Sequence, residues 1–160
     1  MTPASAAPIP MSAMRGGDAT TSPVGRDALE AIAESIAGEG DVFVDALYAR
    51  FFTRCPEARA LFGAHSLSEQ GEMVSETFRA IVAWLDDEPW LDANLIAFGE
   101  SHVEYGVEEA MYPLFVDAFV ETVAARSGEA ESVPGLRLLR TGLEEITRAM
   151  ATRSPVQRRC

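Results

Sequence analysis

The chain has 160 residues, 48% of them hydrophobic, and a formal net charge of −12, which fits one domain with its own hydrophobic core. All 13 basic residues are arginine, and the acidic balance argues against nucleic acids and anionic membrane surfaces as partners. Cys55 and Cys160 are the only cysteines, too few for a disulfide framework, so we expect a cytoplasmic protein. No apolar run approaches the ~20 residues of a membrane span.

The two ends of the chain differ in composition from the middle. Residues 1–24 are rich in Ala, Ser, Thr, Pro and Gly without periodicity, which predicts a disordered leader. They lack the charged and apolar regions of a secretory signal. Residues 152–160 are expected to form a loose basic tail, so the folded domain should span residues 25–151.

Within that domain, apolar residues recur with a period of about 3.6 and without strand alternation. The sequence therefore predicts an all-α fold of six to seven helices. The first helix carries Leu29, Ile32 and Ile36 and should end at Gly38 and Gly40, since glycine commonly follows a helix C-terminus. The second helix carries a partly aromatic stripe: Val44, Leu47, Tyr48, Phe51 and Phe52.

A short turn is expected at Pro56, a residue that suits the first position of a helix. Ser66 and Glu69 are spaced as a capping box and open a long helix, which should end before Pro89. The apolar stripe of this long helix consists of Val74, Phe78, Ile81 and Leu85.

Three further helices are predicted after Pro89. Leu91, Leu95, Phe98 and His102 share one face of the next helix, and Gly106 marks its exit. A loop at residues 127–135 separates the final two helices. Their stripes are Met111, Phe115, Ala118, Phe119 and Thr122 in one, and Leu136, Leu139, Leu143, Ile146 and Met150 in the other.

Tyr48, Phe62, Gln70 and His102 stand at set intervals along these helices, in the segments LYARFFTRCPEARALF, EQGEMVSETF and FGESHVEYGV. This pattern resembles the globin family, most closely the bacterial single-domain globins and the haem domain of flavohaemoglobins, over roughly residues 25–150. The resemblance implies a globin fold around a haem pocket, haem b as the cofactor and O2 as a ligand, with NO or CO as further ligands.

The resemblance also assigns roles to individual residues. It makes His102 the iron ligand and Phe62 the wedge at the haem edge, and it places Tyr48 and Gln70 on the distal side, facing O2. Met73 could replace Gln70 if the preceding corner is built differently. Six further residues are expected to contact the haem: Val74, Phe78, Phe98, Val107, Tyr112 and Phe115.

These residue types suit that chemistry. A neutral imidazole is the usual fifth ligand of a haem iron whose sixth position stays free, and the second nitrogen of His102 could bond the Phe98 carbonyl or the Ser101 hydroxyl. Tyr48 can donate an O–H and Gln70 an N–H to a partly negative O2. In a plainer interpretation, the same His, Tyr and Gln simply pack in a core.

Two short motifs have alternative interpretations. His65 could be a second haem ligand, but it lies five residues before Gln70, so an exposed loop position is the better interpretation. The dipeptide Cys55–Pro56 matches a motif associated with haem regulation, but its place at a helix start favours a structural role.

Some positions depart from the flavohaemoglobin pattern. Those proteins place a Glu in the last helix near the proximal His. This chain has Ser154 near the aligned position and no acidic residue nearby, and Leu139 and Leu143 stand where relatives often have Trp and Tyr. We therefore expect a weaker electron push through His102. No flavin or nicotinamide domain follows, so turnover would require a separate reductase.

The leading hypothesis is a haem-binding globin that binds O2 reversibly. NO dioxygenation with an external reductase would extend this activity, and whether the chain is an enzyme stays open. The alternative is a haem-based gas or redox sensor acting through a partner protein. A haem-free helical scaffold is the third hypothesis, and nothing in the pattern indicates an oligomeric state.

Overall fold

The computed structural model describes residues 23–63 and 66–152, and every regular element in these ranges is helical. The elements are α2 (Pro23–Ala37), α3 (Asp41–Arg54), the short helix η1 (Pro56–Leu61), α4 (Ser66–Leu85), α5 (Pro89–Glu104), α6 (Met111–Ser127) and α7 (Pro134–Thr152). The all-α prediction is confirmed. Among these helices, none is both long and apolar enough to span a membrane.

Proline and glycine set several of the helix boundaries. α2 begins at Pro23, two residues before the predicted domain start, because proline lacks the N–H that a first turn leaves unpaired anyway. α4 ends at Leu85 and α5 begins at Pro89, as expected. Gly106, with φ of +90°, follows the end of α5, a backbone conformation that glycine adopts without strain. The rest of the predicted leader and most of the predicted tail lie outside the described residues.

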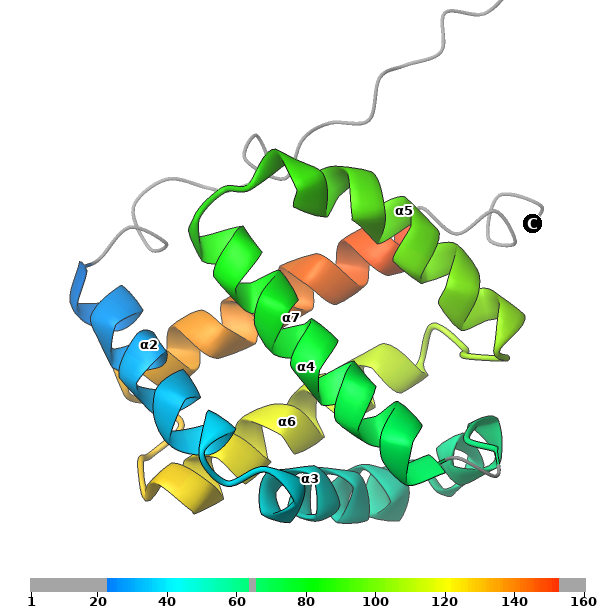
Figure 1. Ribbon diagram of the computed structural model, residues 1–160, viewed down its shortest axis with the longest axis horizontal. Coiled ribbons are helices and arrows are strands. Elements are labelled where there is room, and N and C mark those ends of the chain that lie inside the picture. The colour runs from blue at the N-terminus through cyan, green and yellow to red at the C-terminus, as the bar shows by residue number, and fades with distance from the viewer. Residues whose placement is uncertain (1–22, 64–65, 153–160) are drawn as a thin grey trace, which may run out of the picture.

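α7 is the central packing partner of the fold: it packs against α2, α4, α5 and α6, while α3 packs against α6. Figure 1 shows α4 crossing over α7, with α3 and α5 along opposite edges of the molecule. The largest fully buried side chains are Trp84, Tyr48, Phe43 and Phe119. The ring of Phe43 meets that of Phe119 edge-on, with centroids 5.6 Å apart, a preferred aromatic geometry. This core fixes α3, α4 and α6 around one side of the site.

A close approach of two helices requires glycine at position 99 of α5. A Cβ atom placed there would lie 2.5 Å from the backbone carbonyl oxygen of Met150 in α7. Because a backbone atom cannot move aside as a flexible side chain can, we expect Gly99→Ala to lower the free energy of unfolding by about 1–3 kcal/mol. Chemical denaturation of the purified protein measures this change.

Gly71→Ala is the matched control for that substitution. Gly71 also lies within a helix, α4, but an added Cβ there meets no heavy atom of the described residues within 4 Å. Alanine should therefore stabilise at this position, by up to about 1 kcal/mol, through its higher helix propensity. Equal effects of the two substitutions would contradict the close α5–α7 contact.

Candidate functional site

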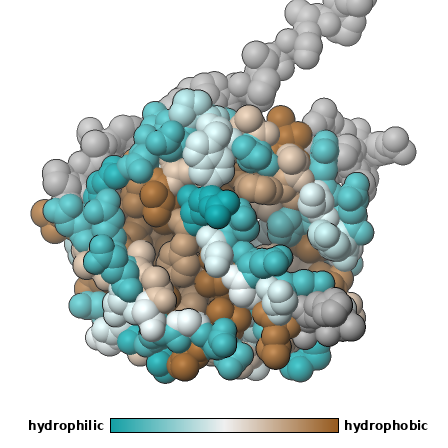
Figure 2. All heavy atoms as spheres, in the orientation of Figure 1, coloured by the Kyte–Doolittle hydropathy of each residue, from teal (hydrophilic) through white to brown (hydrophobic). Residues whose placement is uncertain are grey.

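A cavity of about 350 Å³ lies between α4, α5, α6 and α7, next to the corner made by α3 and η1. This volume is within the range of small-molecule sites in proteins. Figure 2 shows hydrophilic side chains along α4 on the outer face, with apolar side chains beside them. Most of the residues that line the cavity are apolar or aromatic, so the site suits a largely apolar ligand.

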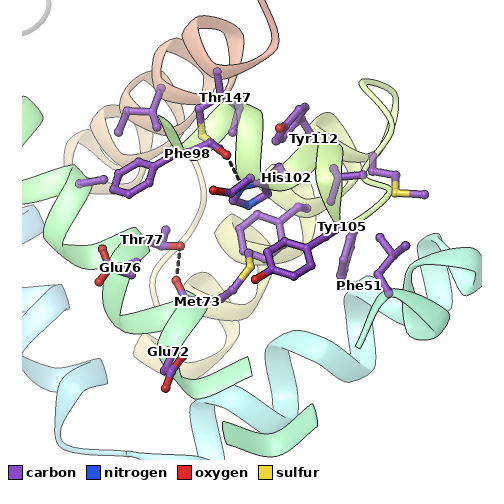
Figure 3. A pocket seen from close by; sticks show the side chains of 18 of the residues that line it. Phe51, Glu72, Met73, Glu76, Thr77, Phe98, His102, Tyr105, Tyr112 and Thr147 are labelled. Atoms are coloured by element: carbon purple, nitrogen blue, oxygen red, sulfur yellow. Dashed lines mark hydrogen bonds between the residues drawn. The ribbon is translucent and has the colours of Figure 1, made fainter. Parts of the chain in front are cut away.

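His102, near the end of α5, lines this cavity, and a hydrogen bond within α5 holds its ring (Figure 3). Its Nδ1 lies 2.7 Å from the carbonyl oxygen of Phe98, one turn earlier. A carbonyl only accepts hydrogen bonds, so Nδ1 carries the proton and Nε2 keeps its lone pair. Of the two partners that the sequence allowed, Phe98 and Ser101, the structure selects Phe98.

The surroundings keep His102 uncharged. Burial lowers the pKa of the imidazole below its usual 6.5, and the hydrogen bond to Phe98 opposes this shift only in part. Desolvation disfavours the charged form of the ring. A neutral imidazole with a free nitrogen lone pair is the form that binds a metal ion.

The predicted aromatic and aliphatic wall around His102 is largely present. Tyr112 at the start of α6 lies beside the histidine, with ring centroids 6.1 Å apart. Burial, with a smaller contribution from Glu109, raises the pKa of Tyr112 to about 12, so its phenol is neutral at physiological pH. Six of the predicted haem-site residues line the cavity: His102, Phe62, Phe98, Val107, Tyr112 and Phe115.

The long helix α4 turns a different stripe toward the cavity from the one predicted. Its lining residues are Glu69, Glu72, Met73, Glu76, Thr77 and Ala80. Gln70, Val74 and Phe78 form the adjacent stripe, one residue further round the helix. Phe78 is partly buried and packs against the core, with its ring centroid 6.0 Å from that of Phe43 and 5.4 Å from that of Phe119.

Gln70 is buried, 7% exposed, but does not line the cavity. Its predicted contact with a gas ligand therefore stays a prediction. The alternative residue at this wall, Met73, does line the cavity. The hydroxyl of Thr77 donates to the carbonyl oxygen of Met73 at 2.7 Å, so this donor is already engaged within the helix.

Tyr48 lies one layer behind the cavity. Its ring packs edge-on against Phe62 at a centroid distance of 5.3 Å and contacts Phe115 at 6.4 Å, and both of these phenylalanines line the cavity. Burial raises the pKa of Tyr48 far above 10, so the hydroxyl stays protonated. Tyr48 thus sits close to the cavity as a neutral hydrogen-bond donor.

The Tyr48 hydroxyl has no partner. Among the described residues, it is the one buried side-chain N or O atom that makes no hydrogen bond in the protein. An unpaired buried donor costs roughly 1–3 kcal/mol, so such groups in native proteins call for an explanation. A ligand in the neighbouring cavity that accepts a hydrogen bond would remove this cost.

Several lining residues did not stand out in the sequence as site residues. They come mainly from the last two helices: Met111, Leu143, Ile146, Thr147 and Met150. Four of them belong to the predicted apolar stripes, and Thr147 follows Leu143 by one turn. Their spacing showed that they face inward, but an apolar residue facing a cavity and one packed in a core have the same sequence pattern.

The mouth of the cavity is acidic. Glu69, Glu72 and Glu76 of α4 line it and are exposed, and Figure 3 shows Glu72 and Glu76 on the α4 side of the site. Among the described residues, no arginine lines the cavity. A ligand with anionic groups would gain no ion pair from the lining and would keep those groups toward water.

Cys55 and His65 have separate outcomes. The buried thiol of Cys55 donates to a carboxylate oxygen of Glu57 at 3.3 Å and sits immediately before Pro56, which opens η1. Cys55 does not line the cavity, which agrees with the structural interpretation. His65 and Ser154 lie outside the described residues.

The fold and this site together define a class of protein. Among the described residues, no group of three His, Cys, Asp or Glu side chains could hold a metal ion by itself. An iron atom at His102 would therefore need its other ligands from a cofactor, as in a haem protein, where the porphyrin supplies four nitrogens. The class is a helical protein in which, among the described residues, one imidazole faces an apolar cavity that suits a cofactor.

Comparison with known families agrees with this class. The family model Globin matches residues 45–137, from α3 into α7, a segment that includes Tyr48, Phe62, Gln70 and His102. The chain belongs to the globin family. No curated protein matches the chain, and the closer resemblance to bacterial single-domain globins and flavohaemoglobins stays a prediction.

The residues around the cavity fit the haem that globins typically bind. His102 offers one free imidazole nitrogen, the wall is apolar and aromatic, and Tyr48 supplies an unpaired buried hydroxyl next to the cavity. These three features match an axial ligand, a porphyrin face and a hydrogen-bond donor toward a gas ligand. The acidic mouth requires only that the haem carboxylates extend toward water.

Proposed function

We propose that this globin binds haem b through His102 and binds O2 reversibly. The observation that carries the proposal is the His102 imidazole, which lines an apolar cavity while its Nδ1 is held at 2.7 Å by the Phe98 carbonyl. When bound, haem supplies the ferrous iron that combines with O2. The tasks of the protein are to hold the ring, to exclude water and to stabilise the gas.

Holding the imidazole in one tautomer and one plane is the task of α5. Because the Nδ1 proton is committed to Phe98, only Nε2 is free to coordinate. The carbonyl is neutral, so it strengthens electron donation by the imidazole less than a carboxylate would. Thr147 is the α7 residue that Figure 3 labels near His102 and Tyr112, and no acidic residue of α7 lines the cavity. This favours reversible binding over O2 activation.

Excluding water is the task of the apolar wall, to which Phe62, Phe98, Val107 and Phe115 contribute. An apolar site lowers the local dielectric and so strengthens each hydrogen bond made within it. Tyr48 would use this effect, because a phenol O–H can donate to a partly negative diatomic ligand. A hydrogen bond to a charged partner contributes about 1.5–3 kcal/mol.

NO dioxygenation and sensing are narrower proposals on the same site. NO dioxygenation would also need an electron donor to return the haem iron to its ferrous state. Sensing would need a partner protein whose affinity changes with the gas ligand. Reversible O2 binding needs neither, and it is the function that the neutral partner of His102 favours.

The test is an O2 titration of the full chain reconstituted with haem b and reduced. We expect visible spectra that change on adding O2 and return to the starting spectrum when O2 is removed, over repeated cycles. Failure to take up haem would overturn the proposal. Immediate, irreversible oxidation on the first exposure to O2 would overturn the reversible part.

A further inference from the structure

We propose that Met73 is a second axial ligand of the haem iron, opposite His102, which a gas molecule must displace before it binds. This inference rests on the proposed haem binding and extends it to the resting coordination state of the protein. It concerns α4, the wall of the cavity where the structure and the predicted residue pattern differ.

Met73 lies in the right place for this role. It lines the cavity from α4, whereas His102 lines it from α5, and the two helices pack against each other. Figure 3 shows the side chain of Met73 directed from α4 into the space in front of the His102 ring. The free Nε2 of His102 and the Met73 sulfur therefore enter one cavity from two different helices.

The other α4 side chains in the cavity are poorly suited to bind iron. Glu69, Glu72 and Glu76 are exposed at the mouth, and moving a carboxylate into an apolar cavity carries a large desolvation cost. Thr77 already donates its hydroxyl proton to the Met73 carbonyl oxygen at 2.7 Å. Ala80 has no donor atom. Met73 is the α4 residue with a neutral donor atom that tolerates an apolar site.

The chemistry of the thioether supports this assignment. Methionine is unbranched and flexible, so its sulfur can adjust by several rotations to meet a metal. A haem iron with one histidine and one methionine ligand has a raised reduction potential, because the soft sulfur favours the ferrous state. A neutral side chain also adds no charge to the apolar wall.

Ligation by Met73 would set how gases bind. A gas that needs an open sixth position binds only the fraction of molecules from which Met73 has dissociated, so its apparent affinity falls by that fraction. Tyr48 would act after this displacement, on the ligand that replaces the sulfur. Without a gas ligand the iron would then be six-coordinate, and only gases that bind iron strongly would displace the Met73 sulfur.

The chain offers a matched control at Met150. Met150 also lines the cavity, but from α7, where its backbone lies against Gly99 of α5, one turn before His102. Met150 therefore belongs to the same side of the cavity as His102, whereas Met73 belongs to the α4 wall. Leucine replaces methionine at nearly constant volume, so Met73→Leu and Met150→Leu differ mainly in which sulfur is removed.

The experiment uses the full chain with haem b, reduced and free of gas. Resonance Raman and magnetic circular dichroism spectra should show a six-coordinate low-spin iron in the wild type and in Met150→Leu, and a five-coordinate high-spin iron in Met73→Leu. The reduction potential should fall in Met73→Leu alone. Rapid mixing with CO should give an association rate for CO that is at least about tenfold higher in Met73→Leu than in the wild type.

Each outcome of this experiment either supports or overturns Met73 as the second iron ligand. A wild-type protein that binds haem and O2 but is five-coordinate when reduced would overturn Met73 ligation and leave the proposed function standing. A six-coordinate spectrum that survives Met73→Leu would assign the ligand to another side chain. Failure of the wild type to bind haem would overturn both proposals. If Met73→Leu does not fold, the wild-type spectrum still tests Met73 ligation, because a five-coordinate iron would overturn it.

Discussion

Replacing His102 by glycine is expected to remove stable haem binding, and added imidazole is expected to restore it. Among the described residues, His102 is the histidine that lines the cavity, and its Nδ1 is already committed to Phe98. Loss of a partner that merely orients a metal ligand typically lowers metal affinity 10- to 100-fold. Removing the ligand itself should therefore weaken haem binding by more than about 100-fold.

The measurement is haem titration of the apoprotein, followed by visible absorption and by transfer of haem to a competing acceptor. Free imidazole should enter the space left in His102→Gly and return an absorption spectrum like that of the wild type. His65→Ala is the control, since His65 is the other histidine of the chain, and it should bind haem normally. Wild-type affinity in His102→Gly would contradict the assignment of the iron ligand.

The second large effect is expected from Tyr48→Phe, and it has opposite signs in the two forms of the protein. In the apoprotein, the substitution removes a buried hydroxyl without a partner. The free energy of unfolding should therefore rise by about 1–3 kcal/mol. In the haem-bound protein, it removes a donor worth about 1.5–3 kcal/mol, so O2 should dissociate roughly 10- to 100-fold faster.

Tyr112→Phe is the matched control. Tyr112 lines the cavity beside His102, so its substitution should leave O2 dissociation within about threefold of the wild-type rate. Chemical denaturation of the apoprotein and stopped-flow O2 release measure the two effects. A less stable Tyr48→Phe apoprotein with an unchanged release rate would show that the hydroxyl has a structural partner.

The raised pKa of Tyr48 also predicts a pH dependence. Burial shifts this pKa upward from 10.0, so above about pH 10 the unfolded chain loses the phenol proton while the folded chain keeps it. The free energy of unfolding should therefore fall as the pH rises through this range. Tyr48→Phe should lose that component of alkaline destabilisation, which unfolding curves between pH 9 and about pH 11 would reveal.

The ends of α5 and the contact between His102 and Phe98 could be predicted, because residues close together in the chain determine them. Pro89 and Gly106 bracket α5, and the spacing of Phe98 and His102 puts the carbonyl one turn behind the imidazole, which is the partner observed. Tyr112 and Phe115 follow on the next helix at one-turn spacing. Such helix boundaries and one-turn contacts depend on residues close together in the chain.

The face that α4 turns to the cavity could not be predicted in the same way. α4 carries two adjacent inward stripes, one with Gln70, Val74 and Phe78 and one with Met73 and Thr77. Both satisfy the helical period, so the pattern alone does not decide which stripe lines the cavity. The choice depends on how α4 rotates as it packs against other helices, where Phe78 meets Phe43 and Phe119.

The sequence by itself determined the all-helical class, most of the helix ends and the inward stripe of α5 that carries His102, because these follow from periodicity, from proline and glycine, and from contacts within one helix. The tertiary structure alone decided that Met73 rather than Gln70 lines the cavity and that the Tyr48 hydroxyl has no partner. Both depend on the relative rotation and spacing of helices far apart in the chain, which packing of the whole core sets.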